Sequence, residues 1–114
     1  MTHFMNLHSQ PFAAIASGRK TIELRLYDEK RQQIRPGDWI VFTNTQAPEK
    51  SLSTQVLQLH IFPSFEVLYQ ELSLTSCGYL PEEVPSASYH DMEAYYSPAQ
   101  QSHYGVVGIE IRLL

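Results

Sequence analysis

Alternation of apolar and polar side chains predicts where the strands of this chain lie. Between Thr21 and Tyr27 the residues at 22, 24 and 26 are apolar, while those at 21, 23, 25 and 27 are polar or charged. Tyr104–Leu113 shows the same period of two and is the strongest strand run. A period of two places successive side chains on opposite faces of a strand. Three further β-rich runs bring the expected strands to five: Thr2–Leu7, Trp39–Thr43 and Ser53–Ile61.

Spacings of three and four residues, together with serine–proline starts, predict short helices. The first begins with Ser9 as its N-cap and ends before Gly18. Its expected apolar face is formed by Phe12, Ile15 and Ala16. The other expected helices open at Pro63-Ser64, lie within Ser86–Tyr96, and open at Ser97-Pro98.

The order of these elements predicts the fold class. Strands and helices do not alternate regularly, which favours an α+β domain, a small and partly closed β-barrel of about five strands flanked by three or four short helices. Val56, Leu57 and Leu59 are the expected apolar anchors of the long fourth strand, and Trp39 is expected in the barrel core. A length of 114 residues is near the commonest domain size, so we expect one domain spanning residues 1–114.

Charge is distributed unevenly along the chain. Six of the eight Lys and Arg residues lie between positions 19 and 35. Residues 1–48 carry a formal charge of +2 and residues 49–114 a charge of −6, which makes the overall charge −4. Such a chain can attract an anion locally while it repels polyanions elsewhere. The distribution therefore predicts a binding site rather than an extended coat for nucleic acid.

Composition and motifs exclude several classes of protein and of binding site. A single cysteine, Cys77, excludes an internal disulfide framework and is expected to be an inert thiol. The five histidines are scattered without metal-ligand spacing, and no phosphate-cradling glycine loop is present, so neither a metal nor a cofactor is expected. The chain has no apolar run of membrane-spanning length and no signal peptide, which makes a cytoplasmic location without membrane contact the expectation.

Three segments carry a resemblance to a known family. They are Pro11–Arg25, which ends in Gly18-Arg19-Lys20-Thr21-Ile22-Glu23-Leu24-Arg25, then Pro36–Phe42, and Tyr104–Ile109. Together they resemble the ASCH domain family of small PUA-like β-barrel proteins, over most of residues 1–61 and 103–114. The resemblance implies that RNA or a nucleotide binds in a cleft beside the barrel. Some members look like enzymes, either small amidohydrolases acting on acylated cytidine or nucleases.

One position departs from the pattern of the amidohydrolase members. Those proteins carry a lysine at the position of Lys20, a threonine nucleophile three residues later, and a distant glutamate. Lys20 matches here, but Glu23 stands in the place of the nucleophile. Glu66 and Glu71 are candidates for the distant glutamate only by rough position. If the chain is nevertheless a small hydrolase, Lys20 would stabilise charge and Glu23 would act as a general base on water.

The leading hypothesis is therefore binding of RNA or a modified nucleoside in a cationic cleft. Lys20 and Arg25 can clamp a phosphate or carboxylate, or they can simply be solvated on a strand edge. Glu23 either forms a structural ion pair or accepts a hydrogen bond from the amino group of a base. We expect the apolar residues at 22, 24 and 26 to be buried while Glu23 and Arg25 line the cleft. The full set of candidate ligand-binding residues is Lys20, Thr21, Glu23, Arg25, Lys30, Arg31 and Tyr104.

The tyrosines of the C-terminal half leave a third hypothesis open. Tyr89, Tyr95, Tyr96 and Tyr104 can stack on bases, but tyrosines on amphipathic segments more often pack in a core. Segment 86–104 can also serve as a protein-interaction surface, although no obligate protein partner is inferred. Clustered cations favour the nucleic-acid hypotheses, because a protein-binding surface does not require them.

Overall fold

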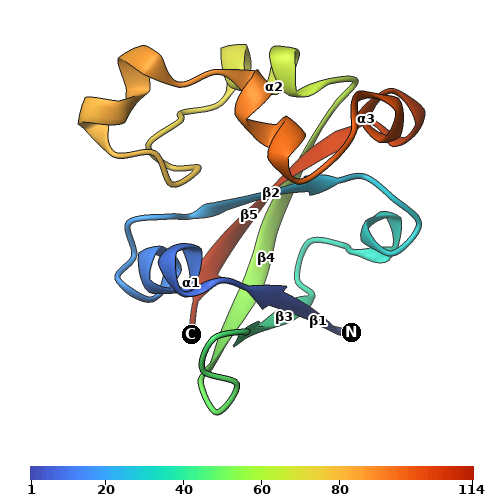
Figure 1. Cartoon of the computed structure of the whole chain (residues 1–114). Coiled ribbons are helices and arrows are strands. Elements are labelled where there is room, and N and C mark those ends of the chain that lie inside the picture. The colour runs from blue at the N-terminus through green and yellow to red at the C-terminus, as the bar shows by residue number, and fades with distance from the viewer.

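All five expected strands are present in the computed structural model, which describes residues 1–114. They are β1 (Thr2–Leu7), β2 (Ile22–Leu26), β3 (Trp39–Asn44), β4 (Ser51–Phe62) and β5 (Val106–Leu113), in the sheet order β1-β3-β4-β5-β2. β1 and β3 run parallel, and all other neighbours are antiparallel. The expected α+β class is confirmed, because this single sheet curls into a half-barrel with helices around it (Figure 1).

The half-barrel is open between its two edge strands, β1 and β2. Side chains bridge this gap. Arg25 Nη2 donates to the Asn6 carbonyl oxygen at 2.8 Å, and Lys30 Nζ donates to the Phe4 carbonyl oxygen at 3.0 Å. The two carbonyls of β1 thus accept hydrogen bonds from side chains, whereas in a closed barrel they would accept them from the backbone amides of a neighbouring strand. Two of the six clustered cations thus contribute to the fold itself.

Inward-facing residues of the sheet and one face of α1 (Ser9–Ala16) form the barrel core. Ile40 and Phe42 of β3 are fully buried, and Phe12 and Ile15 of α1 pack in the same cluster. The strand alternation read from the sequence is what places these side chains on the inner face.

Residues 62–104 form a layer that we call the cap, which packs on the other face of β2 and β5 (Figure 1). The cap contains α2 (Phe65–Glu71), the 3-10 helices Pro81–Ser86 and Tyr89–Ala94, and α3 (Pro98–Tyr104). Phe65 and Leu68 are fully buried in a second apolar cluster with Leu24 and Val106. None of the helices is long and apolar enough to cross a membrane.

The helices differ from the expectations in four details. His8, not Ser9, is the N-cap of α1, and the Ser9 hydroxyl instead donates to Asn44 Oδ1. Ala14 is buried in place of Ala16, because the short helix turns that side toward the barrel. The helix expected within Ser86–Tyr96 is a 3-10 helix. A further 3-10 helix, Arg31–Gln33, follows β2. The helix starts predicted at Pro63-Ser64 and Ser97-Pro98 are confirmed, and the hydroxyls of Ser64 and Ser97 cap them by accepting from Val67 N and Gln100 N.

Two predicted core residues lie on the surface instead. Trp39 is 46% exposed, because Ile40 and Phe42 take the inner face of β3 and their alternate neighbours point outward. Leu57 is also exposed, since the pairing register of β4 and β5 shifts between Val56 and Gln58. Such a shift breaks the regular alternation of side chains along the strand.

Candidate functional site

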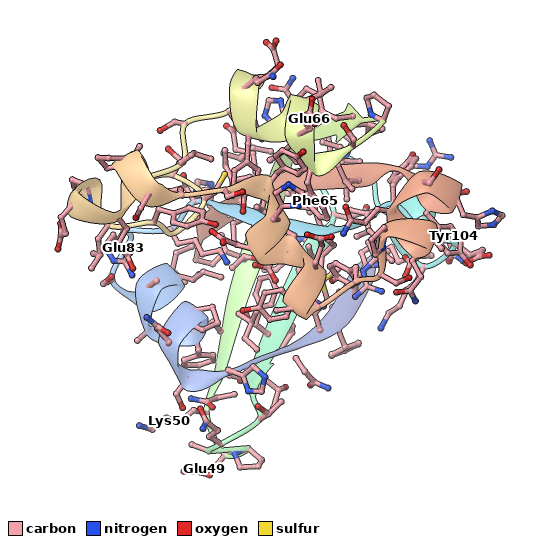
Figure 2. The ribbon with its side chains drawn as sticks, turned by 45° about the horizontal axis from the view of Figure 1, so that its top comes forward. Glu49, Lys50, Phe65, Glu66, Glu83 and Tyr104 are labelled. Carbon is pink, nitrogen blue, oxygen red and sulfur yellow. The ribbon has the colours of Figure 1, made fainter.

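A pocket of about 750 Å³ opens between α1, the edge strands β1 and β2, and the cap. Its charged lining comes from the turn after α1 and from β2 on one side, and from the 3-10 helices of the cap on the other. Figure 2 shows Glu83 at the end of the cap that faces α1, where it lines the pocket. This volume is within the range usual for small-molecule sites.

Glu23 lies between two cations in the wall of this pocket. Its Oε1 is 2.7 Å from Lys20 Nζ and its Oε2 is 2.8 Å from Arg25 Nε. Only 3% of Glu23 is exposed. The expected burial of the apolar residues at 22, 24 and 26 is present, and Glu23 is buried as well, so both faces of β2 are largely covered. The structure therefore brings together Lys20, Glu23 and Arg25 from the predicted set.

The charges of this triad determine the ionisation of Glu23. Burial favours the neutral acid, but the positive charges of Lys20 and Arg25 outweigh it and hold the pKa of Glu23 below its ordinary value. Among all residues that line the pocket, three are cationic (Arg19, Lys20 and Arg25) and three are acidic (Glu23, Glu83 and Asp91). The formal charges of the lining therefore cancel, which differs from the expected cationic character of the cleft.

Two glycines allow Lys20 to reach this position. Gly18 follows α1 with φ of 80°, a left-handed conformation that glycine adopts without strain. The reversal lets the Lys20 amide donate to the Ala14 carbonyl at 3.0 Å. On the cap side, a Cβ added to Gly78 would lie 3.1 Å from Lys20 Cδ, so glycine permits the close approach of the loop. The glycine predicted after the first helix is confirmed as Gly18, and Gly78 is a second position at which the placing of Lys20 requires glycine.

Tyrosines of the cap form the opposite wall. Tyr79 Oη donates to Asp91 Oδ2 at 2.8 Å, and the Tyr69 hydroxyl lies 2.7 Å from that of Tyr79. Burial raises the pKa of both phenols, which keeps them protonated. Tyr95 is 69% exposed, and Tyr96 stacks on Phe65 with ring centroids 6.3 Å apart. The wall thus offers aromatic surface beside the polar triad.

The other predicted binding residues lie outside this pocket. Thr21 joins β2 to the cap and to β5 through its backbone, since its amide donates to the Ser76 carbonyl and its carbonyl accepts from Ile111 N. Lys30 bridges the barrel gap, and Arg31 lies 3.4 Å from Asp28 Oδ2. Tyr104 donates to Glu29 Oε1 at 3.2 Å and lies at the opposite end of the cap from Glu83 (Figure 2). A ligand role for these four residues stays a prediction.

Several pocket residues were not predicted from the sequence. Arg19, which is not among the predicted ligand-binding residues, lines the pocket and donates to the Gly78 carbonyl at 2.8 Å. Tyr69, Cys77 and Tyr79 also line it, and no motif in their segment indicated this. Burial raises the pKa of the Cys77 thiol to about 11. Only the position of Gly78 beside an aromatic residue offered a signal of a close chain approach.

A curled five-stranded sheet, capped by short helices and opening at a pocket between its edge strands, defines a small PUA-like α+β domain. The chain belongs to the ASCH domain family, whose model matches residues 5–114. The resemblance noted in its motifs is thereby confirmed. Comparison with curated proteins finds no match.

Solved structures support the same assignment. The chain is 31% identical to the hypothetical protein PH0355 over the whole of both chains, with a TM-score of 0.80. It is 33% identical to PF0455 from Pyrococcus furiosus, covering 100% of this chain and 98% of that one, with a TM-score of 0.72. A mutant form of ZmASCH from Zymomonas mobilis shares the fold at 13% identity and a TM-score of 0.68, covering 97% of this chain and 67% of that one.

Proposed function

We propose that this protein binds a nucleoside, free or as an unpaired residue of RNA, with the base placed against Glu23. The observation that carries the proposal is the ionised carboxylate held between Lys20 and Arg25 in the wall of a pocket with tyrosines opposite. Membership of the ASCH family supports it further, because the resemblance implies RNA or nucleotide binding beside the barrel.

The triad offers both kinds of hydrogen-bonding group that a base requires. A carboxylate is the natural acceptor for the exocyclic amino group of cytosine. The lysine ammonium has three donors and the arginine guanidinium five, so each retains donors for a base carbonyl after pairing with Glu23. Tyr95 and Tyr96 supply faces for stacking, which is how unpaired bases are commonly held.

The charge balance of the pocket favours the uncharged part of the ligand. Both Lys20 and Arg25 are paired with Glu23, Arg25 also donates to Asn6, and Arg19 donates to Gly78. No cation in the lining is therefore left wholly available to a phosphate. We infer that the base and sugar occupy the pocket and that any phosphate lies outside it.

Binding is preferred to hydrolysis because the pocket lacks an activated nucleophile. Its lining contains no Ser or Thr. The two cations lower the basicity of Glu23, and burial raises the pKa of the Cys77 thiol far above neutrality. Deacylation of an acylated cytidine is accordingly expected to be absent or slow.

Calorimetric titration with cytidine and uridine tests the proposal. We expect cytidine to bind more tightly, Tyr95→Ala to weaken its binding about five-fold or more, and Glu23→Gln to reduce the preference for cytidine. Glu49→Gln is the matched control, since Glu49 is exposed at the far end of the barrel (Figure 2). Failure of both nucleosides to bind, or equal binding by Tyr95→Ala, would refute the proposal. Rapid deacylation of acylated cytidine, followed by chromatography, would make the protein a hydrolase instead.

A further inference from the structure

The outer face of the half-barrel carries two exposed aromatic side chains that no element of the protein covers. Phe4 of β1 is 63% exposed and Trp39 of β3 is 46% exposed. The cap packs on β2 and β5, and α1 packs on the inner side, so neither reaches this part of the sheet. We propose that this face, formed by Phe4, Trp39, Val41, Gln55 and Arg112, binds single-stranded nucleic acid by base stacking. We call it the outer platform.

The register of the sheet places these residues beside one another. Trp39 of β3 pairs with Gln55 of β4, which pairs with Arg112 of β5. In the next row Phe4 of β1 pairs with Val41 of β3. Residues that pair in this way share one face of a sheet, and the diagonal neighbours Phe4 and Trp39 are about 7–8 Å apart. Two aromatic rings on adjacent strands of an open sheet are the arrangement on which RNA-binding sheets stack two or three bases.

The polar groups around the rings suit a nucleic acid rather than an apolar partner. Arg112 is anchored across the platform by donating to Gln55 Oε1 at 2.7 Å. The remaining outward residues of the two rows are Thr2, beside Trp39, and Ser53, beside Val41. The two rings and Val41 are bordered by the polar side chains of Thr2, Ser53, Gln55 and Arg112. A small aromatic surface with a polar border resembles a stacking surface more closely than the large continuous apolar patch expected of a protein interface.

Charge favours a polyanion on this face and disfavours it on the opposite one. The two rows contain no acidic side chain. Asp38, which precedes Trp39, is occupied by His3 and by the amide of Arg35, while Glu110 of β5 is paired with His60. The cap, by contrast, has no Lys or Arg between residues 62 and 104 but contains six acidic residues: Glu66, Glu71, Glu82, Glu83, Asp91 and Glu93. A single strand would therefore be repelled from the cap and attracted to the platform.

The platform also adjoins the mouth of the pocket. Asn6 lies one row beyond Phe4 on β1 and lines the pocket, while Lys30 donates to the Phe4 carbonyl at the strand edge between them. A strand held on Phe4 and Trp39 can thus pass along β1 past the pocket. The two sites remain separate, because they share neither an aromatic ring nor a charged side chain.

Trp39 is the only tryptophan of the chain, so its fluorescence reports on the platform directly. Titration with oligo(U) and with oligo(dT) at low salt should quench this fluorescence. The affinity should fall with salt at a log–log slope of about −0.7 per contacted phosphate. Comparison of the two oligomers shows whether the platform distinguishes RNA from DNA. Given the overall charge of −4, we expect modest affinity.

Variants distinguish stacking on the platform from a general attraction between cations and phosphates. Trp39→Ala, followed by fluorescence anisotropy of labelled oligo(U), should weaken binding about five-fold or more, and Arg112→Glu should weaken it with Trp39 intact. Lys50→Glu is the matched control, because it makes the same charge change as Arg112→Glu but at the hairpin tip (Figure 2). Lys50 is five residues, or about 17 Å, from Gln55, the strand partner of Arg112, so Lys50→Glu should have a smaller effect. Circular dichroism checks that each variant is folded.

The outcomes are distinct from those of the pocket proposal. Trp39→Ala should leave cytidine binding unchanged, and Glu23→Gln should leave tryptophan quenching unchanged. Absence of quenching, or equal oligo(U) binding by Trp39→Ala and the wild type, would overturn the inference. So would self-association that Trp39→Ala abolishes while no oligomer binds, since the face would then be a protein contact.

Discussion

Replacing Glu23 by glutamine tests the central feature of the site, because the two side chains have nearly the same shape. In the wild type each carboxylate oxygen accepts from a different cation, Oε1 from Lys20 and Oε2 from Arg25. A glutamine amide has only one oxygen, and its NH₂ group would face a second donor. The variant must therefore leave either Lys20 or Arg25 without its acceptor in a largely buried position.

The size of the effect follows from this loss. Removing one partner of a buried ion pair costs about 3–5 kcal/mol. The side chains of Lys20 and Arg25 are 11% and 14% exposed, so water can offset part of that cost. We expect Glu23→Gln to lower the free energy of unfolding by about 2–4 kcal/mol. For a domain of this length the corresponding fall in Tm is about 8–20 °C.

The pH dependence provides a second readout with a defined sign. The pKa of Glu23 in the folded protein is below its ordinary value, so its ionisation stabilises the fold above about pH 4.3, the unfolded-state pKa. That stability is lost as the pH falls through the folded-state pKa. Urea unfolding should therefore show a constant difference between wild type and Glu23→Gln from about pH 5 to 8, and a shrinking difference in more acidic buffer.

Two controls make the measurement specific. Glu49→Gln removes an exposed carboxylate and should change stability by no more than about 0.5 kcal/mol. Adding Lys20→Met to Glu23→Gln removes the donor left without a partner, so the double variant should be more stable than the two single losses added together. An unchanged unfolding midpoint for Glu23→Gln, or a difference that widens in acid, would refute the reasoning.

Two further predictions concern groups that support the barrel and the pocket. The hydrogen bond from His3, at 2.8 Å, lowers the pKa of Asp38 to about 2. Asp38→Asn should therefore reduce stability by about 1 kcal/mol at neutral pH, and by less as the pH falls through this pKa and the carboxyl of the wild type becomes protonated, as measured by urea unfolding. An equal loss at neutral pH and near pH 2 would contradict this. In Gly78→Ala the backbone φ of +111° is strained for alanine, and the added Cβ would lie 3.1 Å from Lys20 Cδ. This variant should therefore lower stability by about 1–3 kcal/mol and weaken cytidine binding in calorimetry. Gly37→Ala is the control, because φ there is +93° but the added Cβ meets open space, so binding should be unchanged.

Alternation and capping in the sequence predicted most of the elements, because both are local. The five strands, the start of α2 after Ser64 and the start of α3 after Ser97 follow from neighbouring residues alone. The prediction that Trp39 lies in the core was wrong because it rested on residue type, whereas the alternation with Ile40 and Phe42 places it on the outer face. Alternation itself failed at Leu57, because a register shift depends on the partner strand and leaves no mark in the sequence.

The candidate site, like the fold, could be predicted from the sequence only in part. Lys20, Glu23 and Arg25 could be predicted together because they lie on one short segment whose motif resembles that of the ASCH family. Their pairing, however, depends on burial. Only the packing of α1 and the cap around β2 removes Glu23 from solvent, which ties up the two cations and makes the pocket neutral in formal charge. The sequence by itself determined where the charges are concentrated. The tertiary structure decided that Glu23 is buried between its two cations and that Glu83 and Asp91 share the pocket with them, because both depend on the packing of the distant cap segment against β2.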